Sequence, residues 1–461
     1  MPELRSLLLF TATLAACRAA PESAAPAAPP AGPPASDVAV APAQPAPQDP
    51  RAEVDAATTL VELRSIAAAV NPGAQAALER WRASEQRAPQ SGALPDPRLS
   101  YRYFIESVET RVGPQEQAVG LTQVLPWPGR RASKSAVSES EADAARARYR
   151  AHLASVLESV DAVWCEGYYL ERAIEVVARN RELLASLEEV LRRRYASGGS
   201  AYPDLLRAQV ELDKLLDRQR SLEDQRRPLA ARLNALLDRD AGAVVPRPTA
   251  LPERELLASE AVVADWIRDG SPELAALGHE AEREARMGEV ASLERRPDLT
   301  LGVEWIDTGS AVMSGVPDSG KDPWIVSLSL NLPVWGSRLN AAEEQARASR
   351  RAANLAREEA ARRLESDVEA ALYPLRDAER RSLLYRETLL PRARQSYEAQ
   401  EAAFRAGAAP FLDLIDAERT LLEFELALER AATDRALALN RLERLAGRPL
   451  DELAPDMGAA R

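Results

Sequence analysis

The chain has 461 residues and a formal net charge of -12 at pH 7, and its sequence contains no dense basic run. This charge balance argues against nucleic acid as a partner. Ala, Leu, Glu and Arg dominate while Gly is sparse, which favours long helices, and no stretch approaches the ~20 apolar residues that a membrane-spanning helix requires.

The amino terminus has the features of an export signal. Arg5 precedes a short apolar run, and Leu14-Ala15-Ala16-Cys17 follows, which resembles the lipobox of bacterial lipoproteins. We interpret residues 1–17 as a lipoprotein-type signal peptide with Cys17 as the lipid-bearing residue; an ordinary signal peptide is the alternative. By the same resemblance, Arg18 in place of Asp implies sorting to the outer membrane. Residues 18–50 are rich in Ala and Pro and predict an extended linker.

The rest of the chain divides into two similar halves, residues 51–245 and 253–450, followed by a C-terminal tail at 451–461. Gly and three Pro cluster between the halves and mark the boundary. Each half opens with an N-cap residue and a Pro at the first helical position, Asn71-Pro72 and Ser271-Pro272, which predicts a helix start.

Each opening helix leads into two stretches of alternating polarity. Residues 97–105 and 297–305 alternate apolar with mostly polar or small residues, and we expect the return strands at 118–125 and 324–332. The length and pattern resemble those of transmembrane β-strands; a soluble two-hairpin sheet is the alternative. Four of the seven tryptophans lie in or beside the strands, as a membrane-interface girdle requires: Trp127, Trp305, Trp324 and Trp335.

Both strand pairs end in a proline-containing corner, Leu125-Pro126-Trp127-Pro128-Gly129 and Leu332-Pro333-Val334-Trp335-Gly336. A very long helix is predicted after each corner, over residues 130–196 and 337–406, with a length of ~100 Å at the usual rise per residue. Pro374 and Pro391 should bend the second helix without ending it.

The two long helices end in the same short motif. Residues 195–208 and 404–417 align without a gap, at a fixed offset of about 209 residues. Each copy predicts a helix, a tight turn at Gly198 or Gly407, and a new helix that opens near an Asp. Each copy is therefore expected to be the tip of a helical hairpin.

The helices that follow the tips carry apolar residues at alternating steps of three and four, from Leu205 to Leu236 and from Leu414 to Leu445. This spacing predicts coiled-coil seams. A charged interruption, Arg226 or Arg435, stands at the same place in each seam, which indicates a duplicated structure.

No residue pattern points to catalysis or metal binding. His152 and His279 are isolated and have no Cys or His at ligand spacing, so we expect no metal site and no cofactor. Cys165 lies in a predicted helix, where a small buried residue is the expected role. The sequence therefore predicts a protein that is not an enzyme.

The number of strands predicts an assembly. Four strands per chain cannot close a bacterial barrel, since these begin at eight strands. A dimer would reach eight, with a lumen filled by its own side chains, whereas a trimer would reach twelve and could leave a channel. A homotrimer is therefore the smallest assembly in which we expect an open lumen.

The duplicated order of helix, strand, strand, long helix, tip and helix resembles the TolC family of outer-membrane efflux proteins over essentially all of residues 51–450. Gly407 through Asp413-Leu-Ile-Asp416-Ala417 resembles one of the most specific motifs of that family. The resemblance implies a mainly α fold with transmembrane β, in which three copies form a twelve-stranded β-barrel continued by a twelve-helix α-barrel. It also implies three kinds of partner: a periplasmic adaptor, an inner-membrane pump and outer-membrane lipid.

The same resemblance assigns roles to the tips. The candidates for adaptor docking are Gly198, Asp204, Leu205, Gly407 and Leu414. Asp413 and Asp416 are the candidates for a periplasmic gate, where a trimer would place six carboxylates around one axis; the alternative is that Asp413 only caps its helix. The family has an Arg that latches the closed tip, and Ala409 stands at that position here.

We therefore expect a passive exit duct of a tripartite efflux or type I secretion system. It would be lipid-anchored in the outer membrane of a Gram-negative bacterium and extend into the periplasm. One alternative is a non-porous periplasmic coiled-coil lipoprotein, against which the Trp-flanked strands argue. Another is an adaptor of the same pumps, which would need only one helical hairpin and separate β-domains.

Overall fold

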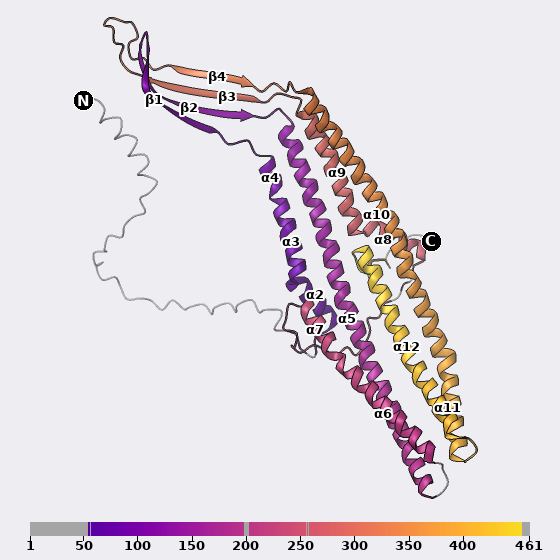
Figure 1. The fold of residues 1–461 in the computed structure, drawn as a ribbon. Helices are drawn as coiled ribbons and strands as arrows, with labels where there is room; N and C mark the ends of the chain where they lie inside the picture. Colours follow the sequence, from indigo (N-terminus) through magenta and orange to yellow (C-terminus); the bar gives the residue numbers. More distant parts are fainter. Residues whose placement is uncertain (1–53, 56, 198–201, 255, 257, 454–461) are drawn as a thin grey trace, which may run out of the picture. The chain divides into compact units, whose positions relative to one another are not determined.

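The computed structural model describes residues 54–55, 57–197, 202–254, 256 and 258–453, which all belong to one compact unit, residues 49–461. This unit is mainly helical and contains a four-stranded sheet (Figure 1). The predicted signal peptide, Cys17, the linker at 18–50, Gly198 and the tail from residue 454 lie outside the described residues. Among the helices that the structure describes, none is both long and apolar enough to cross a membrane.

The two halves place similar elements in a similar order. The first half contains α2 (Leu60–Val70), α3 (Pro72–Glu85), α4 (Arg87–Ser91), β1 (Arg98–Thr110), β2 (Gly113–Leu125), α5 (Arg130–Ala196), α6 (Tyr202–Asp224) and α7 (Arg226–Leu236). The second half contains α8 (Glu260–Gly270), α9 (Pro272–Leu293), β3 (Leu299–Thr308), β4 (Trp324–Leu330), α10 (Gly336–Leu384), the π-helix η2 (Tyr385–Leu389), α11 (Leu390–Arg405), α12 (Phe411–Ala446) and the 3₁₀ helix η3 (Leu450–Leu453).

The predicted helix starts at Pro72 and Pro272 are confirmed, but they do not open the halves, because a shorter helix, α2 or α8, comes first in each half. The Asn71 side chain accepts a hydrogen bond from the Ala74 N–H at 3.1 Å, and Pro72 is the first residue of α3. Ser271 caps α9 in the same way, through the Leu274 N–H at 3.4 Å. In both cases the side-chain oxygen satisfies an N–H that has no partner inside the helix.

The seam predicted as one helix from Leu205 to Leu236 is broken, because α6 ends at Asp224 and α7 begins at Arg226. Pro228 explains the break: it has no N–H to donate, and its ring clashes with the carbonyl group four residues earlier, at Asp224. α12 contains no proline and runs without interruption from Phe411 to Ala446.

The second long helix also changes its geometry near a proline. α10 continues through Pro374, but a π-helical turn precedes Pro391, the second residue of α11. Such a turn is one residue longer than an α-helical turn and accommodates the missing N–H of proline. The path therefore stays helical, as predicted for both prolines.

Two equivalent ion pairs, one in each half, show that the π-helix adds one residue to the second half. Arg226 donates to Glu171, which lies 55 residues earlier, at 2.8 Å. Arg435 donates to Glu379, which lies 56 residues earlier, at 3.1 Å. The π-helix stands between Glu379 and Arg435, so its single extra residue accounts for the difference. The charged interruptions of the predicted seams therefore bind carboxylates on the neighbouring long helices.

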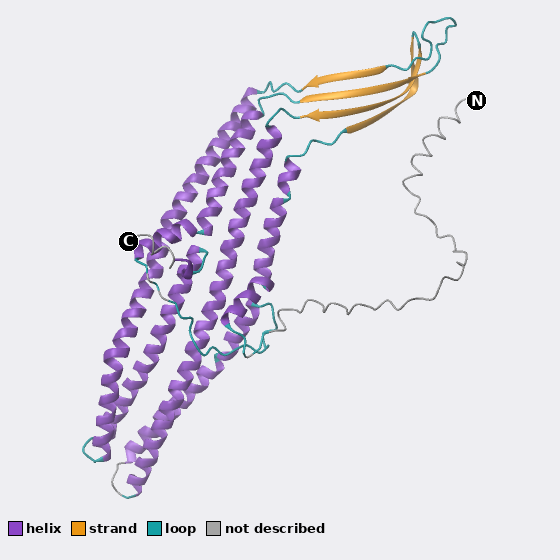
Figure 2. Ribbon diagram, turned by 180° about the vertical axis from the view of Figure 1, so that it is seen from behind, coloured by secondary structure: helices purple, strands orange, loops and turns teal. Residues whose placement is uncertain are grey.

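The four strands are antiparallel in the order β1-β2-β3-β4. They lie at one end of the helices, while the ends of α5 and α11 lie at the other (Figure 1), and Figure 2 shows the same separation of strands and helix ends from behind. Near those ends, α5, α6, α11 and α12 share an apolar cluster, called here the tip cluster, which includes Leu187, Leu191, Leu205, Phe404, Phe411, Leu414, Leu421 and Leu422. A second cluster joins α8, α10 and α12, and a third joins α2, α5 and α7.

Candidate functional sites: the apolar sheet face and the hairpin tips

One face of the sheet is apolar across all of its strands. Residues that lie directly opposite each other in antiparallel strands share a face. The rows on this face include Leu99, Leu121, Val303 and Val326, then Tyr101, Val119, Trp305 and Trp324, then Leu301 with Leu328 and Leu299 with Leu330. In the single chain Val326 is 79% exposed and Leu99 is 72% exposed. A contiguous apolar surface of this kind marks contact with lipid or with another protein.

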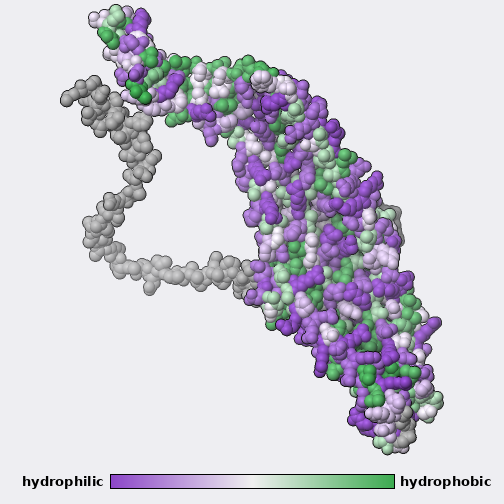
Figure 3. Space-filling model, viewed as in Figure 1, coloured by the Kyte–Doolittle hydropathy of each residue, from purple (hydrophilic) through white to green (hydrophobic). Residues whose placement is uncertain are grey.

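The other face of the sheet is polar or small in most positions. One of its rows consists of Arg98, Thr122, Gly302 and Ser327, and the next row contains Ser100, Gly120 and Glu304. Arg102 and Glu304 form an ion pair on this face. In Figure 3 hydrophobic residues gather along the upper side of the strands, whereas the helices show mostly hydrophilic residues. The sheet therefore has one apolar face and one mostly polar face.

Both outer strands of the sheet have a free edge. Within the part of the chain that the structure describes, β1 pairs only with β2, and β4 pairs only with β3. A free edge presents N–H and C=O groups that can pair with a further strand. Since both edges belong to the same sheet, a second copy of the chain can supply β4 to β1 and continue the order.

The junction between the sheet and the helices is held by one arginine. Arg130, the first residue of α5, is buried and donates to both carboxylate oxygens of Asp298 at 2.5 Å. Its second terminal nitrogen donates to the carbonyl groups of Leu293 and Arg296, each at 2.7 Å. The Trp127 backbone N–H donates to Asp298 at 2.9 Å. These contacts join the corner of the first half to the entry of β3 in the second half.

The hairpin tips repeat an aromatic pair. Tyr195 and Tyr202 flank the first turn with ring centroids 5.6 Å apart, and Phe404 and Phe411 flank the second at the same distance. Gly407 has a φ of 74°, the left-handed region that favours glycine. A side chain at this position would meet no atom within 4 Å, so the glycine serves the backbone of the turn.

The predicted docking residues occupy different environments. Asp204 lies in the first turn of α6 and pairs with Arg207 at 3.5 Å. Leu205 and Leu414 are buried in the tip cluster, 8% and 0% exposed, because they face the neighbouring helices. They stabilise the tips from inside and do not form their surface. The exposed apolar side chains nearby are Tyr195, Tyr202, Leu206, Val210 and Leu412.

The two predicted gate carboxylates are exposed on α12. Pro410 occupies the N-cap position and no side chain caps the helix, so Asp413 does not have the capping role considered as an alternative. Asp413 lies in the first turn, where the helix dipole favours a negative charge. Asp416 pairs with Arg419 at 3.2 Å.

One arginine joins the two hairpins at the tips. Arg194, in the last turn of α5, donates to the carbonyl groups of Phe404 at 2.9 Å and Arg405 at 2.5 Å. Its guanidinium also lies over the Phe404 ring, 4.8 Å from the centroid. A cation placed this way satisfies carbonyl groups at the end of α11 that have no partner inside the helix. Arg194 thus links the two hairpins of this chain at their tips.

Sequence reasoning did not identify Arg130 or Arg194. The sequence did contain an indication of Arg130, because a cation in the first turn of a helix is unfavourable beside the helix dipole unless a nearby acidic group compensates for it. Arg194 gave only a weak signal, because basic residues are common in the last turn of a helix.

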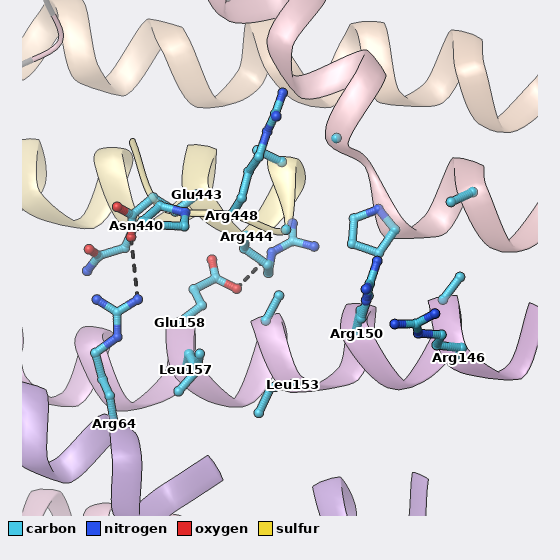
Figure 4. Close-up of a pocket in the computed structure, with 18 of the residues that line it drawn as sticks. Arg64, Arg146, Arg150, Leu153, Leu157, Glu158, Asn440, Glu443, Arg444 and Arg448 are labelled. Atoms are coloured by element: carbon cyan, nitrogen blue, oxygen red, sulfur yellow. Dashed lines mark ion pairs between the residues drawn. The ribbon is translucent and has the colours of Figure 1, made fainter. Parts of the chain in front are cut away.

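A polar cavity of about 580 Å³ lies between α5, the start of α9 and the end of α12. Figure 4 shows ion pairs at its wall from Arg64 to Glu443 and from Arg444 to Glu158. Asp161 is buried beside Arg64 and Arg254, and burial raises its pKa to about 6. The network joins α2, α5, α12 and the segment between the halves, which indicates a structural role.

Cys165 lies close to this network and is fully buried. Burial raises the pKa of its thiol to about 12, which leaves no thiolate for nucleophilic chemistry at neutral pH. The sequence-based expectation of a small buried residue is confirmed. Among the described residues, no group of three or more His, Cys, Asp or Glu could hold a metal ion.

Comparison with known proteins finds a matching family model and distant relatives. Residues 265–448 match the family model described as outer membrane efflux protein. The cobalt-zinc-cadmium resistance protein CzcC of Cupriavidus metallidurans is 23% identical over 403 residues, which cover 85% of this chain and 90% of that protein. The second half of the chain is therefore similar to the outer membrane efflux proteins, and the similarity to CzcC extends over most of both chains.

Two further similarities concern a second curated relative and a solved structure. Nodulation protein T of Rhizobium leguminosarum bv. trifolii is 25% identical over 304 residues, or 65% of this chain; the match spans 64% of that relative's length. A crystal structure of a membrane protein from Pseudomonas aeruginosa has the same fold, with a TM-score of 0.73 and 20% identity over 87% of this chain and 93% of that chain.

Proposed function

We propose that this chain is one subunit of a homotrimeric exit channel that carries substrates passively across the outer membrane. The observation that carries the proposal is the sheet, which has one apolar face, one polar face and two free edges. Three copies joined edge to edge give a closed barrel of twelve strands, wide enough for an aqueous lumen. The apolar face would then contact lipid, and the polar face with Arg102 and Glu304 would line the lumen.

In the proposed trimer the helices of the three copies would also close around the same axis. α3, α5, α9, α10, α11 and α12 run away from the strands, so three copies of them would continue the barrel as a helical tunnel through the periplasm. A polar tunnel wall is consistent with the mostly hydrophilic helix surface (Figure 3). The non-porous alternative leaves the apolar sheet face in water, which is unfavourable.

The test of this function measures assembly and conductance together. Native mass spectrometry of the detergent-purified protein should report three copies, and the same sample should form ion-conducting pores in planar bilayers. A monomer, or a trimer without conductance, contradicts the proposal.

We further propose that the channel is a lipoprotein of a Gram-negative outer membrane, anchored through Cys17. This proposal is supported by the Leu14-Ala15-Ala16-Cys17 sequence and by the Ala- and Pro-rich linker that follows it. Intact-mass analysis of the mature protein should show an acylated Cys17. An unmodified terminus at another residue would remove this part of the proposal.

The hairpin tips are the proposed site of docking for a periplasmic adaptor that connects the channel to an inner-membrane pump. They lie at the end of the helices opposite the strands, and they expose apolar side chains. Asp413 and Asp416, on the same tips, are proposed to line the periplasmic gate.

A further inference from the structure

Glu418 is an acidic side chain in an apolar environment. It lies on α12, four residues after Leu414 and four before Leu422, and both leucines belong to the tip cluster. Its side chain is 2% exposed, and Oε1 is buried without a hydrogen-bond partner. An ionised carboxylate in such a place is strongly unfavourable, so the packed arrangement favours the protonated acid.

The nearest basic residue along the chain does not compensate for this carboxyl group. Arg419 pairs with Glu211 on α6 and with Asp416 on its own helix. Glu211 also repels a negative charge on Glu418. Burial first, and then Glu211, raise the pKa of Glu418 to about 7.

Two other carboxylates of the helices around the tip cluster are paired with arginines of their own helices. On α5, Glu188 accepts from Arg192 at 2.8 Å, and on α11, Arg405 donates to Glu401 at 2.7 Å. Tyr397, also on α11, is buried and its hydroxyl group has no partner. Burial raises the pKa of Tyr397 to about 12, so it stays neutral in the physiological range. Glu418 is therefore the buried acid of this cluster whose charge changes near neutral pH.

We propose that Glu418 is a proton-dependent lock that holds the hairpin α11–α12 on α5–α6 while it is protonated and loosens this packing when it ionises. The packing surface is the tip cluster, and its loss would move α12, the helix that carries both Asp413 and Asp416. The effect on a channel gate rests on the proposed function; the loosening of the two hairpins does not.

The direction of the pH dependence follows from the two states of the carboxyl group. In a loosened, hydrated tip the pKa returns toward the ordinary value of 4.5, whereas in the packed tip it is about 7. The stability that the protonated carboxyl group gives the packed state is therefore fully present below pH 4.5. It is lost as the pH rises through the packed-state pKa of about 7. Within that window each chain should shift toward the loosened state by up to about tenfold per pH unit.

Hydrogen exchange of the full-length protein in detergent tests the lock. Protection factors, corrected for the intrinsic pH dependence of exchange, are measured at pH 5.5 and 8.5 for peptides that cover α11 and the first half of α12. We expect protection in the wild type to fall by about tenfold or more at the higher pH. In Glu418→Gln, which stays neutral, protection should be the same at both values.

Two further variants separate a proton lock from a general loss of stability. Glu423→Gln removes an exposed carboxylate from the same helix and should behave as the wild type. Glu211→Gln removes the repelling charge and leaves Arg419 available to Glu418, so the midpoint of the transition should move to lower pH. A wild type without pH-dependent protection, or a Glu418→Gln variant that keeps the wild-type dependence, overturns the proposal.

Bilayer recordings over the same pH range distinguish this proposal from the channel function. Pores with pH-independent tip protection would overturn the lock and support the channel. Tip protection that depends on pH and on Glu418, in a protein without conductance, would support the lock and contradict the channel.

Discussion

At the scale of single residues, the structure depends on a few guanidinium groups that connect distant parts of the chain. Arg130 joins residues 168 positions apart when it binds Asp298, and Arg194 joins residues 210 positions apart when it binds the carbonyl group of Phe404. Both act where a helix begins or ends, at places where backbone groups lack partners inside the helix. The strand corner and the hairpin tips are thus positioned by long-range polar contacts in addition to apolar packing.

The Arg130 junction gives a stability prediction. Replacing Arg130 by Met leaves Asp298 without its cation and removes one hydrogen-bond donor from each of two carbonyl groups, those of Leu293 and Arg296. We expect the free energy of unfolding to fall by about 3 kcal/mol, the usual cost of breaking a largely buried pair. The double variant Arg130→Met with Asp298→Asn should recover part of this loss, because no unpaired charge remains. Chemical unfolding followed by circular dichroism measures both; a loss below ~1 kcal/mol in the single variant contradicts the assigned role.

The gate carboxylates give a second prediction at this scale. Asp413→Asn with Asp416→Asn should reduce cation selectivity and block by multivalent cations in planar bilayers, because an acidic ring raises the local cation concentration by roughly tenfold. Asp413→Asn alone should have the larger effect, since Arg419 already offsets the charge of Asp416. Asp204→Asn, at the equivalent position of the first tip, is the matched control. Unchanged selectivity in the double variant would place these carboxylates away from the entrance.

At the scale of elements, helix periodicity predicted which residues face the neighbouring helices but not where the backbone breaks. The bounds of α5 agree with the prediction because helix-breaking residues in the sequence, Pro128-Gly129 before it and Gly198 after it, mark both ends. The break at Gln225 was missed because the apolar spacing continues through Pro228, whereas the break arises from the backbone of that proline. The same spacing placed Leu205 and Leu414 correctly on a seam, and this is the reason that they are buried and not available for docking.

The tips therefore need a different docking prediction. Leu412→Glu and Leu206→Glu place charges on exposed apolar positions and should weaken adaptor binding by about tenfold each, while the amount of trimer stays unchanged. Gly407→Glu should act in the same direction, at an added cost of backbone strain. Val244→Glu, an exposed position in the segment between the halves, is the control. Full adaptor binding by the tip variants in a pull-down assay would show that docking lies elsewhere.

At the scale of the whole molecule, the two halves form one sheet and share the tip cluster. β2 pairs with β3 along most of its length, and the tip cluster contains residues of both hairpins. The sequence predicted the strands from their alternation, but it did not show that the two hairpins join into a single sheet, because strand pairing between positions 190 residues apart leaves no local pattern. The pairing makes the apolar face continuous, and it leaves one free edge in each half for assembly.

The sheet provides a prediction that separates its two faces. Leu328 lies on the apolar face and Ser329 on the polar face of the same strand, one residue apart. If the apolar face contacts lipid, Leu328→Lys should cost about 2–4 kcal/mol per chain near the membrane midplane. A trimer carries this cost three times, so the amount of trimer in the outer-membrane fraction should fall sharply. Ser329→Lys should assemble normally, because its ammonium group would lie in the aqueous lumen, and it should lower cation selectivity. Equal amounts of trimer for the two variants in semi-native electrophoresis would contradict the proposed orientation of the sheet.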